Sequence, residues 1–405
     1  MDFELSEEQK ALVALMKEFC LREVDRKALD ELADRPIPPN ATKEDLMARV
    51  PWDLISKAHD VGLRQLAVPT EYGGGGYCQT GGWLTLTLLA EAAGYYGGQI
   101  GRLFTIPWNH CVRLVYAPPA VQEVFFTNFM KNRRTMTAAS HSEPDHGSDV
   151  LLPYDEPGVS GKVTAVRDGD YWVINGDKMF CTGGGVSDYI SVTVRTDPDG
   201  PISKSQTQFL VDTSLPGWSI ARVNDMMGNE ITSNVQMRFE NVRVHKSMML
   251  TELNGASKNL RSGLAAKSLH FMTSLGDCQY VWEQIRDFAK NRIQGGKPII
   301  QHKNIGPMVA EADLMLRTDR LLQYKFAWDC DQEKPGTLVD PLGFWYINHY
   351  HKLACMRLIE VGFEVYGGMA PQKELSFERF VRLHQSILHG GGTGILNLVK
   401  AAKVL

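Results

Sequence analysis

The apolar residues of this chain change their spacing twice along its 405 residues, and this change limits the possible folds more than any other feature. From residue 1 to about 135 they recur at helical spacing, as in EEQKALVALMKEFCLREV (7–24). From about 138 to 248 they alternate with polar residues around turns, as in GKVTAVRDGDYWVINGDKMF (161–180). After about 255 helical spacing returns, over segments long enough to pack as a bundle. We therefore expect three parts in order: an N-terminal helical domain (1–135), a central β domain (136–250) and a C-terminal helical bundle (251–405).

Charge and cysteine usage exclude several classes of protein. The formal net charge is −4 and no run of Lys or Arg occurs, which argues against a nucleic-acid-binding surface. The seven cysteines are scattered without a Cys-x-x-Cys pair, so neither a disulfide framework nor a zinc cluster is expected. The N-terminus is acidic and helical, with Ser6 as the expected N-cap, rather than a signal or transit peptide. No apolar run approaches the roughly 20 residues that cross a bilayer, and a cytoplasmic location without membrane contact is expected.

Three glycines in a row, Gly390 to Gly392, raise the question of a phosphate-binding loop. They lack the Lys-Ser/Thr ending of such a loop and follow a helical segment rather than a strand. A second candidate is His349-x-His351 as a metal-binding pair, but positions i and i+2 of a helix point to different faces. The stretch GYYGGQIG (94–101) lacks the preceding strand of a dinucleotide fingerprint. None of these three patterns predicts a site.

The β domain contains two polar segments rich in small residues, ASHSEPDHGSD (139–149) and INGDKMFCTGGGVSDYI (174–190). Such segments present backbone N–H groups and hydroxyls at close range, which suits a flavin or a pyrophosphate. Each taken alone could equally be an ordinary β turn.

Together, in this order, the motifs resemble the acyl-CoA dehydrogenase family over nearly the whole chain. SEPDHGSD (142–149) is similar to the family's Thr-Glu-Pro-x-x-Gly-Ser-Asp segment, and INGDKMFCTGG (174–184) to its Asn-Gly-x-Lys-x-Trp-Ile-Thr segment. Other stretches resemble the N-terminal helices, the closing strands and three flavin-contacting parts of the bundle: LSEEQKALVALMKEF, VGLRQLAVPTEYGGGGY, MMGNEITSNVQMRFENVRVHKSMML, RIQGGKPIIQHKNI, FEVYGGMAP and FERFVRLHQSILHGGGTGIL. The resemblance implies an α+β chain with an all-α N-terminal domain, a central β-barrel-like domain and a C-terminal four-helix bundle.

The resemblance also implies FAD between the β domain and the bundle, with each site completed by a neighbouring subunit of a homotetramer, or of a hetero-oligomer. Ser142 and Thr182 would hydrogen-bond the flavin ring, and Phe180 would replace the usual Trp against it. Gly147 and Ser148 would approach the flavin and the CoA chain, and Arg292 would neutralise the FAD pyrophosphate. The remaining positions implied at the cofactor are Glu364, Gly367, Gly368 and Thr393.

Three positions depart from the family pattern on the FAD side. The Phe after the arginine is Gly295, a Gln further on is Lys303, and the Gln before the Gly-Gly pair is Glu364. A carboxylate near a pyrophosphate is repelled by it unless a cation neutralises the carboxylate charge. Lys303 is the candidate for that cation.

The catalytic carboxylate is the most consequential departure. In this family a carboxylate removes the α-proton of the acyl-CoA while flavin N5 accepts a β-hydride, so the base must reach Cα. Counting from Arg382, the usual Glu position is Gly391, which makes the glycine run the place where the base is missing. The alternative Glu position, on the first bundle helix, is Ala266, followed by Lys267, a candidate substrate contact with Ser148 and Gly391. An unrelated change at a helix end would also account for the glycines.

Three interpretations follow from the missing Glu. Another residue is the base, with Glu91 and His389 as candidates, and the substrate is a cyclic, branched or acidic acyl-CoA oxidised for an electron-transfer flavoprotein or similar acceptor. Alternatively, the bond that breaks is not C–H, as in an acyl-CoA decarboxylase or desulfinase. In the third interpretation the chain is a two-component flavin monooxygenase of the same fold or a non-catalytic subunit of a heteromeric dehydrogenase.

Overall fold

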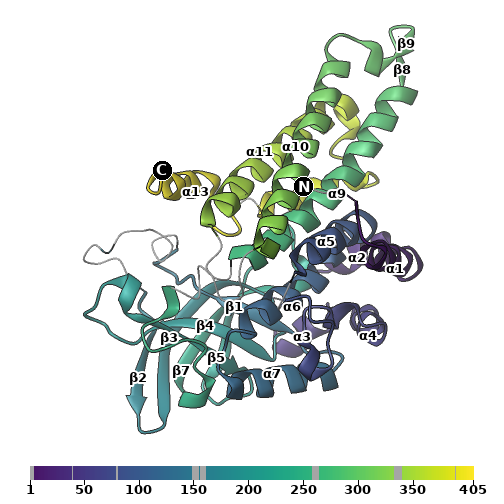
Figure 1. The fold of residues 1–405 in the computed structure, drawn as a ribbon. Coiled ribbons are helices and arrows are strands. Elements are labelled where there is room, and N and C mark those ends of the chain that lie inside the picture. Colours follow the sequence, from purple (N-terminus) through teal and green to yellow (C-terminus); the bar gives the residue numbers. More distant parts are fainter. Residues whose placement is uncertain are drawn as a thin grey trace.

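A computed structural model describes residues 4–38, 40–78, 81–147, 155, 161–257, 264–332, 340–387 and 389–405. Helices precede and follow a single large sheet, so the expected helix–sheet–helix order is confirmed (Figure 1). The N-terminal helices are α1 (Glu7–Glu23), α2 (Arg26–Ala33), α3 (Lys43–Met47), α4 (Trp52–Asp60), α5 (Trp83–Gly97), α6 (Gly101–Leu114) and α7 (Pro119–Lys131).

The first helix begins where the sequence predicts. The Ser6 hydroxyl accepts a hydrogen bond from Gln9 N, and the Gln9 side chain accepts one from Ser6 N, which forms a capping box. Two acidic residues, Glu7 and Glu8, then occupy the first turn, where the helix dipole favours negative charge.

The central domain is a seven-stranded sheet in the order β1-β4-β2-β3-β7-β6, with β5 paired to β4. Its strands are β1 (Thr137–Ser140), β2 (Thr164–Asp168), β3 (Tyr171–Thr182), β4 (Tyr189–Arg195), β5 (Gln206–Asp212), β6 (Trp218–Val223) and β7 (Asn234–His245). The longest pairing joins β3 and β7 antiparallel, and its register shifts between Lys178 and Cys181. Such a shift marks a bulge, which turns side chains out of the regular alternation.

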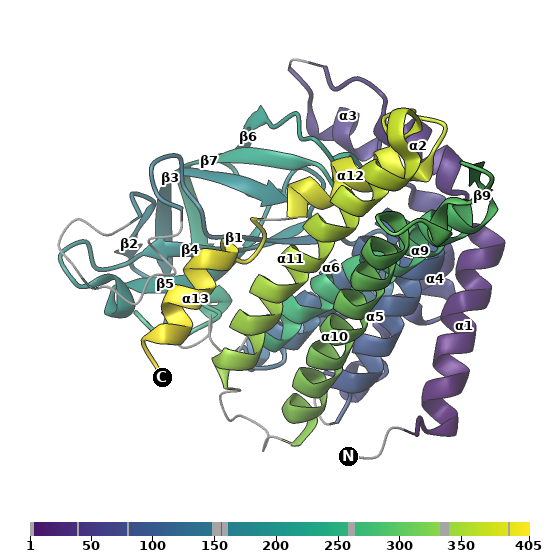
Figure 2. The same cartoon turned by 90° about the horizontal axis from the view of Figure 1, so that it is seen from above.

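The C-terminal part is a bundle of long helices with a small hairpin at one end. Its elements are α9 (Leu264–Asn291), β8 (Ile293–Gln294), β9 (Lys297–Pro298), α10 (Ile305–Gln332), α11 (Pro341–Tyr366), α12 (Ser376–Ile387) and α13 (Gly394–Ala402). The hairpin of β8 and β9 lies at the end of the bundle farthest from the sheet (Figure 1). Viewed from above, α13 lies beside α11 on the side of the sheet (Figure 2).

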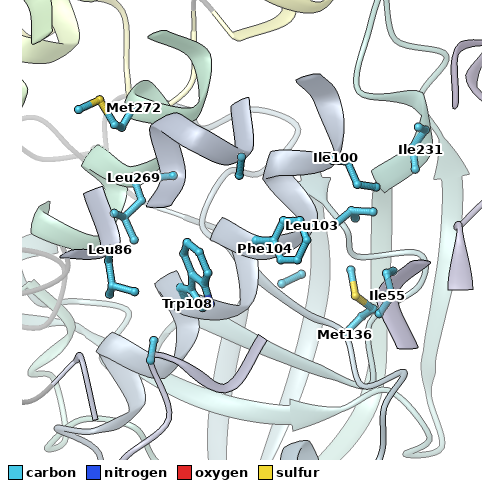
Figure 3. Close-up of a cluster of buried hydrophobic side chains, with 14 of the residues drawn as sticks. Ile55, Leu86, Ile100, Leu103, Phe104, Trp108, Met136, Ile231, Leu269 and Met272 are labelled. Atoms are coloured by element: carbon cyan, nitrogen blue, oxygen red, sulfur yellow. The ribbon is translucent and has the colours of Figure 1, made fainter. Parts of the chain in front are cut away.

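Helix α6 joins the three parts of the chain. Trp108 is fully buried, and its indole N–H donates to the carbonyl of Leu63 at 3.0 Å. Around it lie side chains from the N-terminal helices, from α9 and from the start of the sheet, including Leu86, Leu269 and Met136 (Figure 3). One continuous core therefore holds the sheet and the bundle in a defined relation. Among the described helices, none combines the length and the apolar character that a membrane span requires.

Candidate functional site

The two polar segments of the β domain are held together by a buried ion pair. The Lys178 ammonium lies 2.7 Å from Glu143 Oε1 and donates to the His141 carbonyl at 3.0 Å. Both side chains are almost fully buried, at 1% and 3% exposure. The Ser142 carbonyl also accepts a hydrogen bond from Met179 N at 2.9 Å. The sequence segments that resemble flavin-binding motifs are therefore one structural unit at the end of β3.

Phe180 is presented to the outside of this unit. Its backbone has a φ of +54°, which is unusual for a bulky residue, and its side chain is 57% exposed. The register shift in β3 accounts for this, because it removes Phe180 from the regular pairing with β7. Two residues on, the Thr182 hydroxyl accepts a hydrogen bond from Asn234 Nδ2 at 3.2 Å and remains half-buried. An exposed aromatic ring in a strained backbone suits a planar ligand.

Ser142 and Gly147 lie on the same unit, whereas Ser148 lies outside the described residues. Ser142 is half-buried, and a Cβ added at Gly147 would meet nothing within 4 Å. Gly147 therefore leaves open space beside its backbone, as close approach of a ligand requires.

A second group of predicted cofactor residues lies at the far end of the bundle. Arg292 follows the last turn of α9, is exposed, and makes no side-chain hydrogen bond or ion pair with another described residue. Gly367 and Gly368 follow α11, and a Cβ at either would meet nothing within 4 Å. Glu364 is exposed one turn earlier, and Lys303 forms no ion pair with it in the described part of the chain. Within the described part of one chain, Lys303 therefore does not neutralise the charge of Glu364.

These two groups are too far apart to contact one cofactor from the same chain. Helix α9 has 28 residues and is therefore about 42 Å long. Its first turn lies near the sheet and its last turn carries Arg292 to the hairpin end (Figure 1). The expectation that a neighbouring subunit completes each site therefore stays a prediction, and it requires the Arg292 end of another copy to reach Phe180.

The glycine run forms a loop that α11 holds. Asn348 Nδ2 donates to the Gly390 carbonyl at 3.2 Å, and Lys352 Nζ donates to the carbonyls of Gly390 and Gly392 at 3.3 and 2.5 Å. Burial lowers the pKa of Lys352 to about 8. Gly391 has a φ of +70° and is exposed.

Thr393 ends the glycine loop and begins α13. Its hydroxyl accepts a hydrogen bond from Leu396 N at 3.1 Å, so it is the N-cap of that helix. Position 391 therefore presents an exposed backbone without a carboxylate, between a fixed anchor on α11 and a capped helix.

The two candidate bases lie in different surroundings. Both carboxylate oxygens of Glu91, on α5, are engaged: Oε1 lies 2.6 Å from Arg320 Nε and Oε2 accepts from the Tyr324 hydroxyl. These contacts link α5 to α10, so the carboxylate of Glu91 has a structural role. His389 is exposed two residues before Gly391, and its ring makes no hydrogen bond with another described residue.

The alternative Glu position lies in the first turns of α9, where the side chains of Ala266 and Lys267 are outside the described residues. One turn further, His270 faces α6, with Thr105 Oγ1 at 3.4 Å from Nδ1 and Asn109 Nδ2 at 2.9 Å from Nε2. His270 was not among the candidates, because an isolated histidine in a helical segment carries no signal in sequence.

The sequence also does not predict a role for four residues that hold the two loops in position: Glu143, Lys178, Asn348 and Lys352. Glu143 and Lys178 are 35 positions apart, and Lys352 is 38 positions from Gly390. Lys178 and Glu143 do stand inside the two motif segments, and that placement was the available signal. No spacing rule connects Lys352 with the glycine run.

Comparison with protein families extends over most of the chain. Residues 23–122, 138–242 and 265–404 match the acyl-CoA dehydrogenase N-terminal, middle and C-terminal domains. Three similar curated proteins are 26–27% identical to this chain. One is a 3-(aryl)acrylate reductase of Clostridium sporogenes, and its alignment covers 95% of this chain and 98% of the reductase. A cyclohex-1-ene-1-carbonyl-CoA dehydrogenase of Syntrophus aciditrophicus covers 94% and 85%, and a cyclohexane-1-carbonyl-CoA dehydrogenase of Geobacter metallireducens 93% and 95%.

Solved structures share the fold over the full length. The butyryl-CoA dehydrogenase of Megasphaera elsdenii superposes with a TM-score of 0.84 at 22% identity, covering 100% of both chains. The FAD complex of PigA superposes with a TM-score of 0.85 at 20% identity, covering 100% of this chain and 99% of that one.

Proposed function

Because the chain belongs to the acyl-CoA dehydrogenase family, we propose that it oxidises the Cα–Cβ bond of a CoA thioester whose acyl group is a ring or is branched or acidic. FAD, the cofactor of the family, would supply the hydride acceptor for Cβ when bound. The residues fit this cofactor: Phe180 offers an exposed ring, Arg292 an exposed guanidinium that pairs with no described residue, and Gly147 an open backbone.

One observation carries the choice of acyl group. Gly391 is exposed, and the motif count from Arg382 assigns to it the position at which the family usually has a Glu. Removing that side chain takes away a negative charge and opens volume beside the reacting carbons, which favours a bulky ring or an acid. The relatives named for cyclohexene and cyclohexane carbonyl-CoA substrates support a ring, as does the relative named for aryl acrylates.

We infer that His389 is a better candidate for the base than Glu91. An abstracting group must reach Cα with a free lone pair. Glu91 uses both oxygens on Arg320 and Tyr324, whereas the His389 ring has no partner among the described residues and lies two residues from Gly391. A neutral imidazole would take the α-proton, which the thioester acidifies, and would release it to solvent because it is exposed.

A panel of acyl-CoAs tests the proposal directly. Each is mixed without oxygen with the purified flavoprotein, and loss of the oxidised flavin absorbance is followed. Cyclohexanecarbonyl-CoA, cyclohex-1-ene-1-carbonyl-CoA or a dicarboxylic acyl-CoA should bleach the flavin faster than butyryl- or octanoyl-CoA. If the straight chains bleached it at rates of order 1–1000 per second, the inference from Gly391 would be wrong.

Variants then separate the two candidate bases. His389→Gln should lower the bleaching rate by at least about 100-fold, the usual contribution of a general base. Glu91→Gln is the matched control: it should lower stability while leaving the bleaching rate within a few-fold of the wild-type rate. The reverse result would make Glu91 the base.

The colour of the protein distinguishes the competing functions. A dehydrogenase purifies yellow with oxidised FAD, whereas a two-component flavin monooxygenase holds reduced flavin loosely and a non-catalytic subunit holds none. A decarboxylase or desulfinase would retain FAD but release CO2 or sulfite from the acyl group. We also propose an electron-transfer flavoprotein as the electron acceptor. The assembly is a homotetramer or a hetero-oligomer, because one cofactor requires Phe180 from one copy and Arg292 from another.

A further inference from the structure

A group of buried thiols and imidazoles lies in the core of the bundle, apart from the residues assigned to the flavin. Cys278 on α9, Cys355 on α11 and His384 on α12 each offer one ligand atom, and these three atoms lie within 4.8 Å of one another. Their exposed fractions are 0%, 2% and 1%. The acyl-CoA chemistry proposed above uses none of them.

The separations suit a metal ion better than a disulfide. The two sulfur atoms are 3.3 Å apart. In a tetrahedral zinc site, Zn–S bonds of about 2.3 Å place two sulfurs about 3.8 Å apart, so the pair would open by about half an ångström. A disulfide of about 2.05 Å would require the sulfurs to close by more than one ångström. Reaction with an oxidant also requires access, which the burial of both thiols denies, whereas a metal can enter as the chain folds.

Neighbouring groups orient the histidines as they do around metal ions. His384 Nδ1 lies 3.0 Å from the Phe380 carbonyl and Nε2 lies 3.4 Å from the Ser274 carbonyl. If Nδ1 donates to the closer carbonyl, Nε2 carries the lone pair that a metal ion would use. His351 stands one turn before Cys355, with Nδ1 at 2.6 Å from Asp319 Oδ2 and Nε2 at 3.3 Å from Cys355 Sγ. A carboxylate on the far nitrogen of a ligating histidine is the usual arrangement around zinc.

We propose that Cys278, Cys355 and His384 bind a zinc ion in the core of the bundle. His351, whose Nε2 lies 3.3 Å from Cys355 Sγ and 2.8 Å from Ser274 Oγ, would supply the fourth ligand. Two thiolates would balance the charge of the ion, and a buried site with four protein ligands is a structural one. The ion joins α9, α11 and α12. The ligands are separated by 77 and 29 positions, so the cysteine spacing, from which no zinc cluster was expected, could not predict the site.

Metal analysis of the full-length protein tests this site. After extensive dialysis, mass spectrometry of the elements should find about one zinc ion per chain. Cys355→Ser and Cys278→Ser should each lose it. Cys111→Ser is the matched control, because Cys111 is equally buried, on α6, and should retain the zinc.

A second measurement is needed because the serine variants could fail to fold. Wild-type protein refolded with Co2+ in place of zinc should show the sulfur-to-cobalt absorption of a thiolate site, and flavin-free protein should show it equally. Sub-stoichiometric zinc together with no cobalt spectrum would overturn the proposal. A mass two hydrogens lower without reductant, from a Cys278–Cys355 disulfide, would overturn it as well.

Discussion

Replacing Lys178 by Met tests whether the flavin-side unit of the sheet depends on its buried ion pair. Methionine is unbranched and similar in length, so it removes the charge while filling much of the same space. Glu143 would then remain buried at 3% exposure without its cation. Among the described residues, its carboxylate would keep the backbone hydrogen bonds from Lys162 N and Val163 N.

The expected cost follows from that burial. Breaking a buried pair by removing one partner costs about 3–5 kcal/mol, because a charge stays in the interior. Lys162→Met is the matched control. Lys162 Nζ lies 2.6 Å from Oδ2 of Asp145, which is in the same segment as Glu143, but the two side chains are 71% and 65% exposed. Solvent screens an exposed pair, so removing it costs little. Lys178→Met should therefore destabilise the protein clearly more than its control.

Denaturant unfolding followed by tryptophan fluorescence gives the comparison, and flavin content gives a second readout. Lys178→Met should also lose FAD, since Ser142 and Phe180 sit on either side of the pair. Adding Glu143→Gln to Lys178→Met should restore more than half of the lost stability, because the stranded charge is gone. The argument is refuted if Lys178→Met matches Lys162→Met, or if the double variant is less stable than the single one.

Two further variants test the flavin and the glycine loop. Arg292→Ala should lose most of the bound FAD while leaving the fold intact, since the side chain is exposed and has no described partner; Arg317→Ala, another exposed arginine of the bundle, should keep it. Gly391→Glu should gain oxidation of butyryl-CoA and lose turnover of ring substrates. Gly391→Ala is its control, because both variants carry the cost of about 1–2 kcal/mol for a left-handed residue and both bring a Cβ to 3.1 Å from Asn348 Nδ2. Equal behaviour of the two variants would show that position 391 does not face the substrate.

The order of the three structural parts was predictable because each has its own apolar spacing. Helical spacing in the first and last thirds and alternation in the middle are local properties of short windows, and the sheet of β1 to β7 appears where the alternation lies. The capping box at Ser6 was predictable for the same reason, since its two partners are three residues apart. The strand order was not, because β1 pairs with β4 and β2 with β4 across long stretches of chain.

The candidate site was predictable only as segments. The motifs marked the turn at Ser142 and the end of β3, but the contact that holds them together, Lys178 to Glu143, depends on folding across 35 positions. The bulge that exposes Phe180 is likewise a property of the β3–β7 register. The anchoring of Gly390 by Asn348 and Lys352 depends on how α11 packs beside α13.

The same distinction explains why a missing base is easier to predict than its replacement. The prediction that the usual Glu is missing rests on counting along one continuous motif from Arg382 to Gly391, which needs no knowledge of the fold. A replacement base need only lie near the reacting carbon in space. Any titratable residue of the chain is therefore a candidate, and its distance along the sequence does not indicate how good a candidate it is. The structure changes the ranking through hydrogen-bond partners: it engages Glu91 fully between α5 and α10, and it leaves the ring of His389 without a described partner beside the vacated position. A base that is two residues away on the same loop also moves with that loop. Substitutions that reposition the loop, such as Lys352→Met, should therefore lower the rate of proton abstraction, measured as the rate of flavin bleaching, even though the described hydrogen bonds of the Lys352 ammonium go to backbone carbonyls.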